Sequence, residues 1–262
     1  MPARPLTREV FSVHSHPEVR IVDRSLGPAP ESLPLNADFR PDSLKLKLTV
    51  QISWSSPNVS EALRDFGQRF ERISPSFARH RCGGTGGYDI HSLLLSGVAC
   101  DNGELEPGLA LAHLMEHVMI DVVAFVSSPG RVSGATGAHR ETSDRYDVFV
   151  ECEHPVVADL AVELALTWVE DLGTDLDRER KTALEAAHEL YLRRPLDISV
   201  EEAAALRGIE TPHMARAFAW LAHHGIASRE SYAMNFGGLL VYRLSTGETV
   251  APTAGGEAPE HP

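Results

Sequence analysis

The stretch Leu109-Ala-Leu-Ala-His113-Leu-Met-Glu116-His117-Val-Met-Ile-Asp121-Val-Val-Ala-Phe125 decides how this sequence is interpreted. Its apolar residues predict a buried helix, and positions i, i+3 and i+4 of a helix project from one face. His113, Glu116 and His117 are therefore expected on one helical turn. Two imidazoles one turn apart can bind one metal ion, and H-x-x-E-H is the pattern of inverted zinc hydrolases. In that pattern the carboxylate, here Glu116, acts as general base.

The apolar surroundings give this motif its weight. The chain contains 13 histidines, so five residues could match the pattern by accident. Isolated polar groups are costly to bury, however, and a metal ion is an effective partner for them. We therefore predict one zinc ion per chain, bound in part by His113 and His117. The alternatives are a hydrogen-bonded structural cluster and a site that has lost its metal.

Composition restricts the class of protein. The 24 basic and 37 acidic residues give a formal charge of −13, which disfavours non-specific binding to nucleic acids or acidic membranes. We expect no membrane-spanning segment, because polar residues interrupt the apolar helix. The N-terminus has no apolar signal core, and three cysteines give no disulfide framework, so a cytoplasmic protein is expected.

Changes in composition and periodicity divide the chain into four parts. Residues 1–40 are rich in Pro, Ser and charged residues, and we expect a loosely ordered lead-in. Residues 41–193 mix strands with helices, which predicts an α+β metallohydrolase-like domain. Residues 194–248 predict a winged-helix-like domain, because two short helices precede a glycine-tipped hairpin. Residues 249–262, with Pro, Gly and Glu, predict a disordered tail.

Individual elements follow from local patterns. Strands are expected where polar and apolar residues alternate, and helices where apolar residues recur with helical spacing. The expected strands are Glu18–Val22, Leu44–Trp54, Arg131–Ala138, Tyr146–Cys152 and Leu239–Leu244. The expected helices are Glu61–Ile73, Glu106–Ser127, Pro155–Leu172, Asp175–Leu192, Leu196–Gly208 and His213–His224. Several strands have no crossover helix between them, so the sheet is expected to be antiparallel or mixed.

Glycine and cysteine residues give weaker signals. Residues 80–89 are glycine-rich, but neither the Lys-Ser/Thr pair nor the helix of a phosphate-binding loop follows them. Cys82, Cys100 and Cys152 are each expected to be small buried residues rather than nucleophiles. Only Cys82, next to glycines, has a loop-like setting.

With the motif helix in place, the middle of the chain, about residues 70–190, resembles the N-terminal domain of cyanophycin synthetases. The resemblance is carried by Leu111–Asp121, His139-Arg-Glu-Thr-Ser143, Tyr146–Glu151 and the segment from Pro75 to His80-Arg-Cys82. It implies a pitrilysin-like metallopeptidase fold, shared with S-ribosylhomocysteine lyases, with a mixed sheet and helices on one face. It also implies hydrolysis of a peptide such as cyanophycin. We expect no synthetase activity, because the family's ATP-grasp and Mur-ligase-like domains are not found in these 262 residues.

The same resemblance implies where the third zinc ligand lies. Pitrilysin-type enzymes carry a glutamate ligand on a helix after a strand pair, which corresponds here to Asp175–Glu189. Glu185 is the first choice by its distance from the motif, and Glu179, Glu189 and Glu151 are the alternatives. Ordinary solvated glutamates on a charged helix are the simpler interpretation of these residues.

Two further residues are candidates for supporting roles. Arg140 resembles the arginine of the family's Arg-Glu-Thr block and is expected to hold a substrate carboxylate or an oxyanion. Asp121, one turn beyond His117, is expected to orient that imidazole. A surface or salt-bridged arginine and an ordinary helix-face charge are the simpler interpretations.

The favoured hypothesis is a zinc-dependent hydrolase acting on a peptide or small-molecule amide. One alternative is a non-catalytic metal-containing sensor, adaptor or transcription regulator that acts through the winged-helix-like domain. Another is a metal-dependent small-molecule lyase, which a thiolate ligand from Cys100 or Cys152 would favour. The second helix of the winged-helix-like domain offers His213 and Arg216 but no basic cluster, so docking or homodimerisation is expected of it rather than DNA binding.

Overall fold

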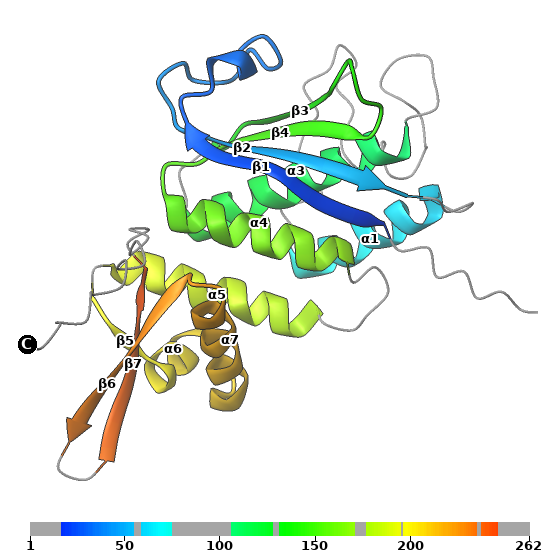
Figure 1. Cartoon of the computed structure of the whole chain (residues 1–262). Helices are drawn as coiled ribbons and strands as arrows, with labels where there is room; N and C mark the ends of the chain where they lie inside the picture. The colour runs from blue at the N-terminus through cyan, green and yellow to red at the C-terminus, as the bar shows by residue number, and fades with distance from the viewer. Residues whose placement is uncertain are drawn as a thin grey trace, which may run out of the picture.

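The computed structural model describes residues 17–54, 59–74, 106–127, 131–170, 177–194, 196–234 and 237–245. Within these residues, a four-stranded sheet is covered by helices, and a smaller module with its own three-stranded sheet follows (Figure 1). Strands and helices are segregated into layers rather than alternating in a parallel sheet, so the expected α+β class is confirmed.

The larger sheet has the strand order β1-β2-β4-β3, and every neighbouring pair is antiparallel. Its strands are β1 (Glu18–Gly27), β2 (Lys45–Ser53), β3 (Gly134–Ala138) and β4 (Arg145–Glu151). The sequence predicted an antiparallel or a mixed sheet. For these four strands the antiparallel sheet is confirmed and the mixed sheet is wrong. The antiparallel pairing places β3 and β4 side by side as a hairpin, with β3 at the edge of the sheet.

The expectation of a loose lead-in is wrong for residues 17–40. The strand expected at Glu18–Val22 extends to Gly27, and β1 pairs with β2 along its whole length. Most β1 residues are exposed because the strand lies at the edge of the sheet, so its sequence shows little hydrophobic alternation. A boundary at residue 41 would separate this strand from its partner.

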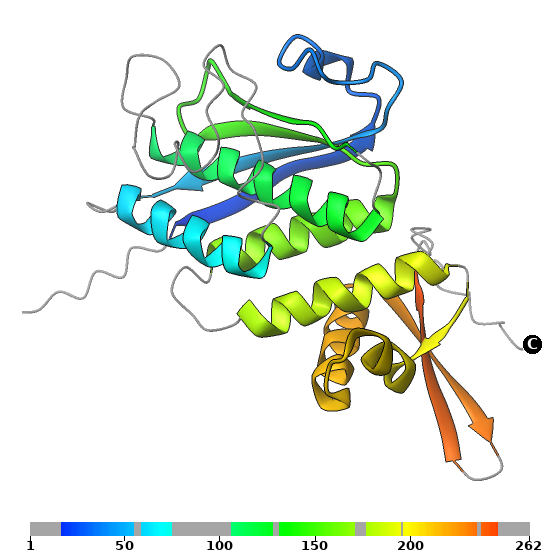
Figure 2. The same ribbon diagram turned by 180° about the vertical axis from the view of Figure 1, so that it is seen from behind.

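Helices α1 (Val59–Ile73), α3 (Pro107–Ser127) and α4 (Pro155–Glu170) cover one face of the sheet (Figure 1 and Figure 2). All three begin and end within two residues of the expected bounds. The motif helix α3 packs against both β4 and α4, and most of its residues are buried. The helical layer therefore covers one face of the sheet, as the resemblance implied.

Helix α3 has 21 residues and is apolar enough to cross a membrane by length and composition, which the sequence analysis did not expect. In the structure, 72% of its most apolar window is buried inside the protein. Its apolar surface is covered by the sheet and by α4, which is the environment of a core helix.

The C-terminal part consists of α5 (Asp177–Arg193), β5 (Ile198–Ser199), α6 (Val200–Arg207), α7 (Thr211–His223), β6 (Ala227–Met234) and β7 (Gly237–Leu244). Its sheet has the order β5-β7-β6 and is antiparallel. The expected pair of short helices followed by a hairpin is present. Strand β6, from a segment rich in polar residues, had no separate prediction.

Local signals explain where the short helices begin and end. The Ser199 side chain accepts a hydrogen bond from the Glu202 backbone N–H and so caps the start of α6. Gly208 ends α6 with a φ of 63°, in the left-handed region that favours glycine. Pro212 lies in the first turn of α7, as expected from its fixed φ.

Helix α5 joins the two parts of the chain. It lies on the side of the helical layer away from the sheet (Figure 1), where it packs against α3 and also against α7. His188 contacts the carbonyl oxygen of Val126 at 3.0 Å, which places the later turns of α5 at the C-terminal end of α3. A domain boundary after residue 193 remains a prediction, because α5 shares contacts with both sides.

Candidate metal centre

Helix α3 brings His113 and His117 together as the motif spacing predicts. Their Nε2 atoms are 2.8 Å apart, and the rings stack with centroids 4.8 Å apart at an angle of 15°. Two nitrogen atoms bound to one tetrahedral zinc ion at about 2.05 Å would lie about 3.3 Å apart. The pair therefore converges nearly as a shared ion requires, although one hydrogen bond between two neutral imidazoles also fits this distance.

Burial sets the protonation state of His113. His117 is 2% exposed, and burial lowers the pKa of His113 to about 4. The His113 imidazole is therefore neutral near pH 7, and the neutral ring is the form that binds metals. The donor chemistry of the two side chains thus fits a divalent ion such as zinc.

Glu116 lies on the same turn of α3 as the histidine pair, and its side chain faces β3. Its Oε2 accepts a hydrogen bond of 2.6 Å from Thr136 Oγ1. Burial raises the pKa of Glu116 to about 8, and the hydrogen bond from Thr136 offsets part of this effect. A carboxyl group with a pKa near neutrality can both accept and return a proton at physiological pH.

A glycine in β3 makes this arrangement possible. A Cβ atom at Gly134 would lie 2.7 Å from Oε1 of Glu116 and 2.7 Å from Cδ1 of Ile120. The strand can approach the motif helix this closely only because position 134 carries no side chain. Sequence analysis missed both Gly134 and Thr136, since no local pattern links β3 to α3.

Asp121, the residue expected to orient His117, is 2% exposed. Its Oδ2 accepts a short hydrogen bond from Oγ of Ser74, which directly follows α1. Its effect on the His117 ring remains a prediction. Ser74 is a third residue, after Gly134 and Thr136, that no sequence pattern indicated.

The first turn of α3 is fixed to the sheet by Glu106. The Glu106 carboxylate accepts hydrogen bonds from the backbone N–H groups of Gly108 (3.1 Å) and Leu109 (2.9 Å). It also accepts a short hydrogen bond from the Tyr146 hydroxyl on β4. Both contacts hold the motif helix against the sheet, so its histidines have a defined position.

The structure places Glu185 and Glu189, two of the expected third ligands, beside an arginine rather than beside the histidines. Arg207 Nη1 lies 2.8 Å from Oε2 of Glu185, and Arg207 Nε lies 2.5 Å from Oε1 of Glu189. Both carboxylates are partly or fully buried, so the arginine supplies the charge partner that burial demands.

The other two candidates also have partners elsewhere. Glu179 Oε1 lies 3.5 Å from Nε of Arg216, and Glu151 accepts hydrogen bonds from the backbone of Arg40 (2.8 Å) and the hydroxyl of Ser43 (2.7 Å). In the seven described ranges of the chain, no third His, Cys, Asp or Glu joins the histidine pair in a group that could hold a metal.

Arg140 is exposed in the turn that joins β3 to β4, four positions beyond Thr136. An extended chain places it within about 14 Å of Thr136. A contact with substrate at that distance depends on the size of the substrate, so the role of Arg140 remains a prediction.

Cys152 is buried and its Sγ donates to the carbonyl oxygen of His154 at 3.3 Å. Burial raises its pKa to about 11, so the thiol is neutral, as expected of a small buried residue. Cys82, Cys100, the glycine-rich residues 80–89 and the Pro75–Cys82 block lie outside the described residues.

Neither a scan against protein-family models nor a search of curated proteins finds a match to this chain. The resemblance to the N-terminal domain of cyanophycin synthetases is therefore carried by the motif residues alone. The functional interpretation depends on the geometry of His113, Glu116 and His117.

Proposed function

We propose that this protein is a zinc-dependent hydrolase of an amide bond, with the ion held by Nε2 of His113 and His117. This proposal rests on the 2.8 Å distance between Nε2 of the half-buried His113 and Nε2 of the buried His117, on the helical turn that also carries the buried Glu116. Zinc, when bound, supplies Lewis-acid chemistry and lowers the pKa of water. No third protein donor is assigned, because the four candidate glutamates have other partners.

The chain's own residues would perform the proton transfers. Glu116 takes a proton from water and passes it to the leaving amine, a role suited to a pKa of about 8. Thr136 holds one carboxylate oxygen of Glu116 in place through its hydroxyl. Arg140, on the turn after β3, would bind a carboxylate of the substrate.

We infer a pitrilysin-like fold for the domain predicted at residues 41–193, with β1 added to it, in a cytoplasmic protein. An antiparallel sheet with helices on one face, and a motif helix buried against that sheet, supports this assignment. A peptide or a small amide, with cyanophycin as one example, is the substrate class proposed by resemblance.

For the C-terminal part we propose a winged-helix-like module that serves docking or homodimerisation. Four arginines of the C-terminal part lie against carboxylates, which disfavours contacts with DNA phosphates. The pairs are Arg193–Glu202, Arg207–Glu185, Arg216–Glu179 and Arg243–Asp197.

Metal analysis of the purified protein tests the hydrolase proposal. We expect about one zinc per chain in the wild type and a loss of most of it in His113→Ala and in His117→Ala. His223→Ala is the matched control, because His223 is an exposed histidine at the end of α7. Equal metal content in all four proteins would show that the pair is only a hydrogen-bonded cluster.

Glu116→Gln separates metal binding from catalysis. We expect this variant to keep its zinc and to lose at least about a hundredfold in hydrolysis of a peptide probe, beginning with cyanophycin. A variant with zinc and full activity would exclude Glu116 as the base.

A further inference from the structure

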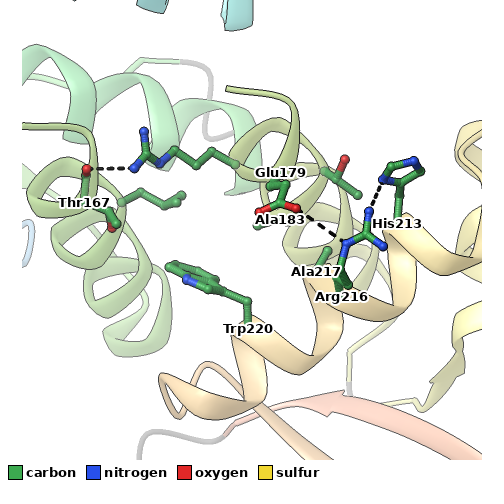
Figure 3. A pocket seen from close by; sticks show the side chains of 10 residues that line it. Thr167, Glu179, Ala183, His213, Arg216, Ala217 and Trp220 are labelled. Carbon is green, nitrogen blue, oxygen red and sulfur yellow. Dashed lines mark hydrogen bonds and ion pairs between the residues drawn. The ribbon is translucent and has the colours of Figure 1, made fainter. Parts of the chain in front are cut away.

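A cavity of about 240 Å³ lies between α4, α5 and α7 (Figure 3), and none of the residues that line it belongs to α3. Its apolar wall includes Leu164, Ala183 and Ala217, and Trp220 projects into the space between the helices. Its polar lining includes Thr167, Glu179, Arg180, His213 and Arg216. The cavity therefore lies where the helical layer meets the C-terminal module, separate from the proposed metal centre.

Two pairs of charged or polar side chains connect α7 to the helices on the other side of this cavity. His224 Nδ1 lies 3.0 Å from Glu163 Oε2, which connects the end of α7 to α4. Arg216 Nε lies 3.5 Å from Glu179 Oε1, which connects α7 to α5. A molecule in the cavity would therefore contact both parts of the chain at once.

The polar lining of the cavity is unusually positive for this protein. It carries Arg180 and Arg216 against one carboxylate, Glu179, although the chain as a whole has a formal charge of −13. Arg180 is only 6% exposed and donates from Nη2 to the Thr167 carbonyl oxygen at 2.9 Å. Arginine stays protonated at physiological pH, so this wall of the cavity keeps its charge.

The position of Arg216 indicates where an anion would bind. Its Nη2 donates to Nδ1 of His213 at 2.5 Å, and its only carboxylate contact among the described residues is the 3.5 Å pair with Glu179. Both members of that pair are more than half exposed, and exposed pairs of this kind contribute little. A ligand carboxylate could take the place of Glu179 and bind the planar guanidinium through two hydrogen bonds.

We propose that this cavity binds a small organic anion, with a planar apolar body packed against Trp220 and a carboxylate held by Arg216. The aromatic wall favours a flat ring, and the small alanines leave room for it. The volume is below that of cavities for drug-sized molecules, so a compact ligand is expected. Because the ligand would touch α4 and α7 together, it would hold the module against the helical layer.

Titration of the full-length protein with 4-fluorobenzoate, followed by fluorine NMR, tests this proposal. We expect saturable binding at concentrations below about 10 mM, and binding at least about tenfold weaker for the neutral isostere 4-fluorobenzamide. Arg216→Gln should weaken benzoate binding about tenfold or more. Arg229→Gln is the control, since Arg229 is exposed on β6 and does not line the cavity.

Glu179→Gln gives a result that a purely structural role of Arg216 would not give. Removal of the competing carboxylate should tighten benzoate binding severalfold, whereas loss of an inter-helix contact would weaken it. The absence of saturable binding, equal affinity for the benzamide, or weaker binding in Glu179→Gln would each overturn the proposal.

Discussion

Helices α3 and α5 both bury glutamates, but they supply them with different partners. On α5, Glu185 and Glu189 face Arg207 at 2.8 and 2.5 Å. On α3, Glu116 is bonded to the hydroxyl of Thr136, and no lysine or arginine of the described residues forms an ion pair with it. A carboxylate that already has an arginine stabilises the fold, whereas one held only by a hydroxyl is available to a cation or a reacting proton.

The largest expected change in the free energy of unfolding comes from replacing one glutamate on each helix with glutamine. Glu185→Gln should lower the free energy of unfolding by about 2 kcal/mol, because it removes a partly buried charge that faces Arg207. Glu116→Gln should raise it by about 1 kcal/mol in metal-free protein, because glutamine is neutral at every pH, whereas burial makes folding disfavour the ionised form of Glu116. Urea unfolding at pH 7.5 with a chelator measures both values.

Glu141→Gln is the control for that pair of variants, since Glu141 is exposed in the turn between β3 and β4. Its effect should stay within about 0.5 kcal/mol. Equal losses of stability in Glu116→Gln and Glu185→Gln would break the distinction between the two helices.

The sequence predicts the arrangement of the α3 side chains well, because it depends only on the geometry of one helix. Positions three and four apart on a helix must meet, so His113 and His117 converge whatever surrounds them. The bounds of α3, β2 and β4 follow from periodicity for the same reason.

The environment of the α5 glutamates could not be predicted, because their partner side chain lies in another element. Glu185 has the right residue type and distance along the chain for a metal ligand, but only the packing of α6 shows that Arg207 neutralises it. Thr136 and Gly134 were missed for a similar reason, since the approach of β3 to α3 is a tertiary contact. The predicted range of β1 is too short, because an exposed edge strand needs little hydrophobic alternation and so leaves a weak sequence pattern.

A glycine substitution tests how closely β3 determines the position of Glu116. Gly134→Ala would place a Cβ 2.7 Å from the carboxylate and from Ile120, so either the strand or the Glu116 side chain must move. We expect a loss of about 1–2 kcal/mol in the free energy of unfolding, measured with urea, together with reduced hydrolysis of the peptide probe.

Gly137→Ala in the same strand is the matched control. Its added Cβ would be 3.6 Å from the nearest atom, on Leu35, which is ordinary contact. Similar stabilities for the two alanine variants would mean that β3 does not restrict the motif glutamate. A loss confined to position 134 would sharpen the contrast with α5, whose carboxylates are fixed by charge.

Asp147, on the other face of the sheet from α3, gives the smallest test of the same rule. Burial alone would raise its pKa, but hydrogen bonds from Thr49 and His139 and the charge of Lys47 outweigh burial, so the pKa is lowered. Thr49 Oγ1 donates to Asp147 Oδ1 at 2.6 Å, and Lys47 Nζ lies 3.6 Å from Oδ2. Asp147 therefore resembles the α5 glutamates, because it has a cation as well as a hydroxyl.

A lowered pKa means that the charged form of Asp147 stabilises the folded state. That contribution is present above the unfolded pKa of about 3.9 and is lost as the pH falls through the lower folded value. We expect Asp147→Asn to be less stable than the wild type by about 1 kcal/mol at pH 6, and this gap to shrink toward pH 3, in urea unfolding at both pH values. A gap independent of pH would show that Asp147 acts through packing rather than charge, and the cation would then not be what separates Asp147 from Glu116.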